Sequence, residues 1–110
     1  EFTVAPQTNP INGELAYHQW FIEFEDPIDN LPEIAQKLDS VLQIQNSYYK
    51  DLLDGNMLQQ LKISPLEKGA FQGYMKSQGK LGGQNKVPRL SNDRKIADKL
   101  AIFKLKNTTL

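Results

Sequence analysis

The sequence predicts a small domain of mixed α/β content, in the α+β class. We expect a three-stranded mixed sheet with packed helices, in the order β-β-α-β-α-α. The chain has 110 residues, which suits one domain. Segments with alternating apolar residues, typical of strands, occur among segments whose apolar residues recur every three or four positions, typical of helices. Stretches rich in glycine, proline, asparagine and aspartate separate them.

Two strands open the predicted order. Thr3–Ala5 is a short strand-like run, and Ala16–Glu25 alternates and is rich in aromatic and β-branched residues. One face of this second segment carries His18, Trp20, Ile22 and Phe24, and the other carries Tyr17, Gln19, Phe21 and Glu23. Turn-forming residues 8–13 lie between the two segments, so we expect an antiparallel hairpin with a loose loop.

A long helix is predicted next, from about Leu31 to about Leu53. Asn30 or Asp29 is a suitable N-cap, and Pro32 suits the first turn. Residues 54–56, Asp-Gly-Asn, are typical of a helix end. The apolar residues have helical spacing and form one stripe, made of Leu31, Ile34, Leu38, Val41, Leu42, Tyr48 and Leu52.

A third strand and a second helix follow. Residues 58–66 are typical of a strand, although residues 64–67, Ser-Pro-Leu-Glu, also fit a helix capping box. Gly69 is unfavourable inside a helix, so we expect the second helix to begin near Lys68 or Gly69 and to end near Gly79. The succession of strand, helix and returning strand suggests a right-handed crossover. The inward residues of this helix are expected to be Phe71, Tyr74 and Met75.

The last predicted helix runs from Asn92 to about Phe103, with Ser91 as its N-cap. Its apolar face carries Ile96, Leu100 and Phe103.

Charge is divided between the two halves of the chain. Residues 1–55 carry a formal charge of −8 and residues 56–110 carry +8, which together give a net charge of zero. A basic half is typical of a surface that binds an anionic partner. The alternative is that the two halves attract each other, or that the bases form a solvated face.

Composition excludes several kinds of chemistry. The chain has no cysteine, which excludes disulfides and thiolate metal sites. A single histidine, His18, provides neither a zinc site nor a catalytic pair, and a buried or edge position suits it better. The acidic residues 23–29 lack the spacing and the central glycine of a calcium loop. We therefore expect no metal site. No apolar run reaches the length of a membrane span and no leader opens the chain, so we expect a cytoplasmic location without a membrane partner.

The segment from Gly79 to Arg89 is the most informative for function. Gly82 and Gly83 allow positive φ angles and a close approach of the backbone to a ligand. Lys86 and Arg89 are cations near these glycines, and a lysine on a glycine-bearing loop can contact a phosphate. The spacing matches neither a Walker loop nor a dinucleotide fingerprint, so composition alone also fits a plain surface loop.

Residues 82–90, Gly-Gly-Gln-Asn-Lys-Val-Pro-Arg-Leu, resemble the lysine-x-proline-arginine segment near the end of the auxin-responsive acyl-acid amido synthetases. Residues 2–6, 18–25, 38–49, 69–71 and 76–80 resemble further pieces of the C-terminal domain in the same order. The resemblance spans nearly the whole chain and is closer to bacterial members than to plant members. Plant members usually have Gln-Tyr before the lysine and Thr-Pro-Arg-Cys after it, whereas this chain has Gln-Asn before and Val-Pro-Arg-Leu after.

The resemblance implies that residues 1–110 form the C-terminal lid of a longer enzyme of the adenylating superfamily. Such an enzyme converts a carboxylic acid and ATP-magnesium to an acyl-adenylate and then forms an amide with an amino acid or another amine. ATP and magnesium would bind mainly to an N-terminal domain outside this chain, so the chain alone would be inactive. Lys86 would neutralise phosphate charge, and Arg89 would either assist or form a structural salt bridge. Gly82, Gly83 and Asn85 would contact the nucleotide.

Two other classes of function compete with the lid. The basic half suggests a nucleic-acid-binding module, but no known motif accompanies it and the bases are not interleaved with aromatics, so we expect no nucleic acid partner. A regulatory or interaction module is also compatible with the strand and helix order, because fold alone does not decide function.

Overall fold

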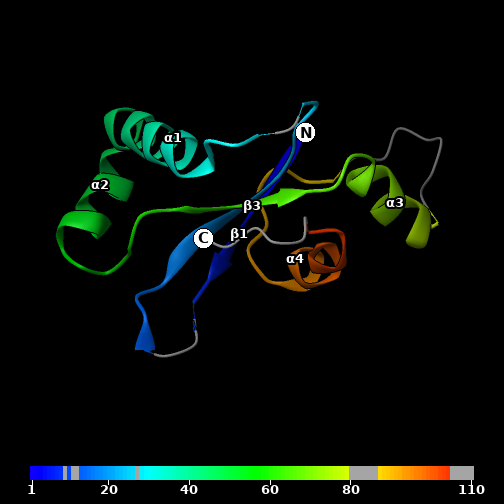
Figure 1. Ribbon diagram of the computed structural model, residues 1–110. Helices are drawn as coiled ribbons and strands as arrows, with labels where there is room; N and C mark the ends of the chain where they lie inside the picture. The colour runs from blue at the N-terminus through cyan, green and yellow to red at the C-terminus, as the bar shows by residue number, and fades with distance from the viewer. Residues whose placement is uncertain (9, 11–12, 27, 80–86, 105–110) are drawn as a thin grey trace.

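A computed structural model describes residues 1–8, 10, 13–26, 28–79 and 87–104 of the chain. Its elements follow the predicted order of strands and helices, with the first helix divided in two (Figure 1). They are β1 (Phe2–Gln7), β2 (Tyr17–Glu23), α1 (Leu31–Gln45), α2 (Ser47–Asp54), β3 (Lys62–Leu66), α3 (Ala70–Ser77), α4 (Lys95–Leu100) and the 3₁₀ helix η2 (Ala101–Phe103).

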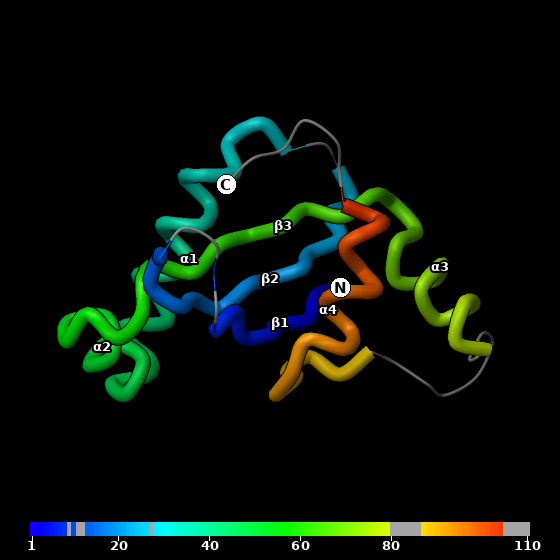
Figure 2. Tube along the Cα trace, turned by 90° about the horizontal axis from the view of Figure 1, so that it is seen from below, coloured from blue at the N-terminus to red at the C-terminus, as the bar shows by residue number. Residues whose placement is uncertain are grey.

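The three strands form one mixed sheet in the order β1-β2-β3, as Figure 2 shows. β1 and β2 are antiparallel, with Val4 opposite Trp20, and the expected hairpin is therefore confirmed. β2 and β3 are parallel, with Trp20 opposite Ile63. Parallel neighbours need a long connection, and α1 and α2 provide it.

The sheet separates two apolar clusters, and the alternation predicted for β2 decides which residues join each. Phe21 belongs to a cluster with residues of α3 and α4, including Phe71, Tyr74 and Leu100. Trp20 and Ile22 point to the other side and pack with α1. Figure 1 shows α1 and α2 together on one side of the sheet and α3 and α4 on the other. The described residues thus form three layers, with the sheet between the two cores.

The predicted helix from Leu31 to Leu53 is interrupted at Asn46. This residue has extended backbone (φ −137°, ψ 95°), and its side chain accepts a hydrogen bond from the backbone N–H of Tyr49 in the first turn of α2. Asparagine competes well for such capping positions, so it ends one helix and starts another. Two residues of the expected apolar stripe are exposed, Val41 by 47% and Tyr48 by 71%, and Tyr49 is buried in place of Tyr48.

Residues 64–66 lie in β3, so the strand is confirmed over the competing capping box, but it begins at Lys62 and not at Leu58. As expected, α3 begins after Gly69, whose φ of 85° only glycine adopts easily. The last helix begins at Lys95, not at Asn92. The reason is that the backbone N–H of Ser91 donates to the carbonyl of Val4 in the sheet, while Asp93 accepts from the N–H of Lys95.

None of the helices within the described ranges combines the length and the apolar character needed to cross a membrane.

Candidate functional site

The described segment 87–91 lies along the free edge of β1. The N–H of Val4 donates to the carbonyl of Arg89 at 2.9 Å, and the N–H of Ser91 donates to the carbonyl of Val4 at 2.8 Å. These bonds make a parallel bridge between Val4 and Leu90. Figure 2 shows this yellow-to-orange segment on the β1 side of the sheet, before α4. Residues 89–91 thus extend the sheet beyond β1 by a single parallel bridge.

Arg89 is exposed, and its guanidinium lies over the ring of Phe2, 5.4 Å from the ring centre. Phe2 in turn stacks on Trp20, with ring centres 5.3 Å apart. A guanidinium on an aromatic face keeps its N–H donors free for an anion in its own plane. Among the ion pairs of the described residues, none involves Arg89. The guanidinium of Arg89 therefore lies over the ring of Phe2 at the sheet edge, and its charge is accessible to solvent.

The other four predicted site residues, Gly82, Gly83, Asn85 and Lys86, lie outside the described residues. Their proposed roles consequently remain predictions from the sequence. The structure describes the residues that flank this segment in the chain. They are α3 before it and residues 87–91 after it.

The start of α3 is tied to the sheet by Glu23, at the end of β2. One carboxylate oxygen accepts from the N–H of Gly69 at 2.8 Å, and the other accepts from the N–H of Phe71 at 3.0 Å. The first N–H groups of a helix lack partners within the helix, and a carboxylate there also suits the helix dipole. Sequence reasoning missed this role because the carboxylate lies 46 positions from the first N–H it caps.

A second tie joins the start of α4 to all three strands through Arg94. Its guanidinium donates to the side chain of Gln19 at 2.6 Å and to the carbonyl of Pro6 at 3.4 Å. Gln19 in turn donates to the hydroxyl of Ser64 at 2.8 Å, which connects Arg94 to β3. The sequence signal for this network is the polar Gln19 on the same face of β2 as Phe21. The network ties the start of α4 to the face of the sheet that carries Phe21.

The face under α1 and α2 carries a buried polar cluster around Asp39. The carboxylate of Asp39 accepts from the hydroxyl of Tyr49 and from the amide of Gln43, the latter at 2.7 Å. The N–H of Leu61 donates to the Tyr49 hydroxyl at 3.2 Å. Burial and the bond to Asp39 raise the pKa of the Tyr49 hydroxyl. This cluster joins α1, α2 and the start of β3.

His18 is half-buried beside the same cluster. Its ring stacks on that of Tyr49, with centres 5.2 Å apart. Burial lowers the pKa of His18 below its ordinary value. His18 therefore lies on the α1 and α2 side of β2, the face that alternation assigns to it together with Trp20, and stacking on an aromatic ring indicates a structural role.

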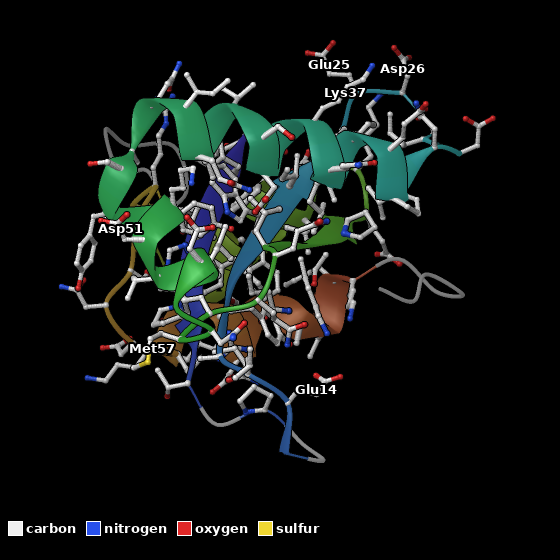
Figure 3. The ribbon with its side chains drawn as sticks, turned by 90° about the vertical axis from the view of Figure 1, so that its left-hand side faces the viewer. Glu14, Glu25, Asp26, Lys37, Asp51 and Met57 are labelled. Carbon is white, nitrogen blue, oxygen red and sulfur yellow. The ribbon has the colours of Figure 1, made fainter. Side chains whose placement is uncertain are left out.

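Apart from the buried Asp39 and the half-buried Glu23, acidic residues of the first half lie on the surface. Figure 3 shows Glu14, Glu25, Asp26 and Asp51 at the periphery of the side that carries α1 and α2, and all four are exposed. Within the described ranges, no group of three His, Cys, Asp or Glu side chains is placed to hold a metal ion. The acidic charge is therefore a solvated surface.

A shallow hollow of about 230 Å³ lies between the start of α1 and the start of β3. Its lining includes Pro32, Ala35 and Lys62. β3 is at one edge of the sheet and β1 at the other, so this hollow is remote from the segment that carries Arg89.

The fold and the described part of the site together define a small three-layered α+β domain with residues 87–91, including the exposed Arg89, at one edge of a mixed sheet. The sequence pattern of the GH3 family C-terminal domain matches residues 1–95, and the chain therefore belongs to this family. No curated protein matches the chain.

Two solved structures have the same fold. One is described as GH3.15 acyl acid amido synthetase, with a TM-score of 0.75 and 16% identity. The other is described as AtGH3.15 acyl acid amido synthetase in complex with 2,4-DB, with a TM-score of 0.71 and 16% identity. Each match covers 96% of this chain and 20% of the solved chain. This chain thus spans about a fifth of the length of these synthetases.

Proposed function

We propose that residues 1–110 are the C-terminal lid domain of an ATP-dependent acyl acid amido synthetase. The observation that carries the proposal is the match of residues 1–95 to the GH3 family C-terminal domain. The likeness in fold to two larger synthetases over 96% of this chain supports it.

In the proposed reaction, a carboxylate attacks the α-phosphorus of ATP, which forms an acyl-adenylate and releases pyrophosphate. An amino acid or another amine then attacks the acyl carbonyl, which forms the amide and releases AMP. Water would hydrolyse the acyl-adenylate, so a closing lid that excludes water protects the intermediate. The ATP, the acid and the amine are assigned mainly to the N-terminal domain, the proposed partner of this chain, and the chain alone is inactive.

Within this chain, Lys86 is the proposed cation that neutralises negative charge on the departing pyrophosphate. Preorganised charge of this kind commonly contributes about a hundredfold or more to rate. Gly82 and Gly83 permit the backbone to approach the phosphates, and Asn85 contacts the nucleotide. Arg89, which is exposed and lies over the ring of Phe2, is proposed to supply a second positive charge.

Magnesium, when bound with ATP, shields phosphate charge. We assign it to the portion of the synthetase outside this chain. Because the reaction draws on ATP, we also propose a cytoplasmic location.

The test is acid-dependent ATP–pyrophosphate exchange by the native polypeptide that carries this domain. Lys86→Ala is expected to lower the exchange rate by about a hundredfold. Lys80→Ala removes another lysine of the same segment and serves as the matched control, with a change of less than about threefold. Equal rates for the native protein and Lys86→Ala would show that Lys86 has no part in adenylation.

A further inference from the structure

The main chain of Arg89 is anchored to β1. Its carbonyl accepts from the N–H of Val4 at 2.9 Å. The carbonyl of the preceding residue, Pro88, accepts from the hydroxyl of Thr3, which is 1% exposed. The following residue, Leu90, forms the parallel bridge with Val4. The backbone of Arg89 is therefore fixed at the sheet edge, and what is left to be placed is its long side chain.

An aromatic stack places that side chain. The guanidinium of Arg89 lies over the ring of Phe2, with its central carbon 5.4 Å from the ring centre. Phe2 in turn stacks on Trp20, with ring planes 22° apart, and Trp20 packs against the apolar cluster under α1. Two rings thus connect the exposed guanidinium to the core of the domain.

The stack orients the guanidinium without neutralising its charge. Arg89 forms no ion pair with the carboxylates of the described residues. The positions outside the described ranges contain neither aspartate nor glutamate, so they offer no acidic side chain either. A guanidinium stacked on a ring keeps its in-plane N–H donors for a further anion. The aromatic contact is therefore compatible with a role of Arg89 toward an anion outside this chain.

Such a contact matters because an exposed arginine side chain otherwise samples many rotamers. Ordering it costs free energy at the moment it meets an anion, and a preformed contact removes part of that cost. A cation–π contact at an exposed site changes the population of the stacked form by about two- to fivefold. Loss of the ring should therefore lower, without abolishing, the share of molecules in which the guanidinium is in place.

We propose that Phe2 is a positioning residue for Arg89 in the adenylation half-reaction. Its ring holds the guanidinium plane at the β1 edge, ready for the negative charge that develops on the departing pyrophosphate. Phe2 acts only through Arg89. This inference rests on the proposed function, since it needs Arg89 to act in adenylation.

The test is acid-dependent ATP–pyrophosphate exchange by variants of the native polypeptide. Phe2→Leu keeps an apolar side chain but removes the ring face, and we expect its kcat to fall by about two- to fivefold. The KM values for ATP and the acid stay unchanged, because the charge that Arg89 meets develops only in the transition state. Phe2→Tyr keeps the ring face and is expected to leave kcat unchanged. A loss of kcat for Phe2→Tyr equal to that for Phe2→Leu would contradict the role of the ring.

Tyr49→Phe is the control for stability. It removes a buried hydrogen bond to Asp39 and leaves the stack of Phe2 on Trp20 in place. We expect its melting temperature to fall while its kcat, measured well below the melting temperature, is preserved. If kcat followed melting temperature in the same way for Tyr49→Phe and Phe2→Leu, Phe2 would be merely structural and the inference would be overturned.

A double variant separates this inference from the proposed function. Arg89→Ala alone is expected to lower kcat by at least about tenfold. Phe2→Leu should have no further effect in that background, because the ring acts through the guanidinium, and losses that multiply would overturn the positioning role. A loss for Arg89→Ala without a loss for Phe2→Leu would reject the inference alone. No loss for Arg89→Ala would reject the role of Arg89 and the inference with it, while the Lys86→Ala exchange rate decides the proposed function separately.

Discussion

Tyr49→Phe tests how much stability the buried cluster around Asp39 supplies. The hydroxyl of Tyr49 both donates to the carboxylate of Asp39 and accepts from the N–H of Leu61. After its removal Asp39 keeps the amide of Gln43 at 2.7 Å, and Leu61 keeps only a long contact with Asp39 at 3.4 Å. Loss of a hydrogen bond to a charged group, next to a weakened backbone donor, costs about 2–3 kcal/mol.

Urea unfolding of the 110-residue chain measures this loss. Trp20, the single tryptophan, packs in the core on the same side and reports unfolding by fluorescence. We expect a lower midpoint with an unchanged m-value, and a melting temperature about 10 °C lower. Tyr48→Phe is the matched control, because its side chain is 71% exposed and the change should stay within about 0.5 kcal/mol. Equal stabilities for the two variants would refute the account of this cluster.

Three further predictions concern other contacts of the fold. Burial lowers the pKa of His18, so the folded state favours the neutral ring and the unfolded state binds more protons near pH 6.5. The unfolding free energy should therefore fall as pH drops from 7.5 to 5, and His18→Gln should flatten this slope; an unchanged slope would contradict the assignment. At Gly73 an added Cβ would lie 3.0 Å from a ring carbon of Phe103. Gly73→Ala should therefore gain about 1 kcal/mol more stability in a Phe103→Leu background than in the native chain, by urea unfolding, and equal gains would show that the ring yields without cost. Glu23→Gln should lose about 1–2 kcal/mol because one of the two capped N–H groups of α3 loses its acceptor oxygen. The exposed Glu25→Gln is its control, and equal losses in thermal unfolding would exclude the cap.

The fold class was predictable because its main signals are local. The alternation in Ala16–Glu25 correctly assigned Phe21 to one core and Trp20 to the other, since the side-chain period of a strand is two. The break at Asn46 was not predictable from apolar spacing alone. It depends on a local competition in which the Asn46 side chain caps a new helix and turns Tyr49 inward.

The site was predictable only in part. Sequence pattern selected Arg89, and the structure places it at the edge of the sheet. Its attachment to β1 was not visible, because Val4 and Arg89 are 85 positions apart and pairing at such separation leaves no local periodic signal. The same applies to the hydroxyl of Thr3 on the carbonyl of Pro88 and to the carboxylate of Glu23 on α3.

The most direct test of the lid proposal is the mass of the native polypeptide that carries this sequence, by immunoblot or intact mass from the source cells. The solved synthetases with this fold are about five times longer, since the match covers 20% of their chains. The account predicts a polypeptide several times heavier than 12.5 kDa, with this domain at its C-terminal end. A native mass close to 12.5 kDa would contradict the proposal that this domain closes over a larger adenylating domain in the same chain.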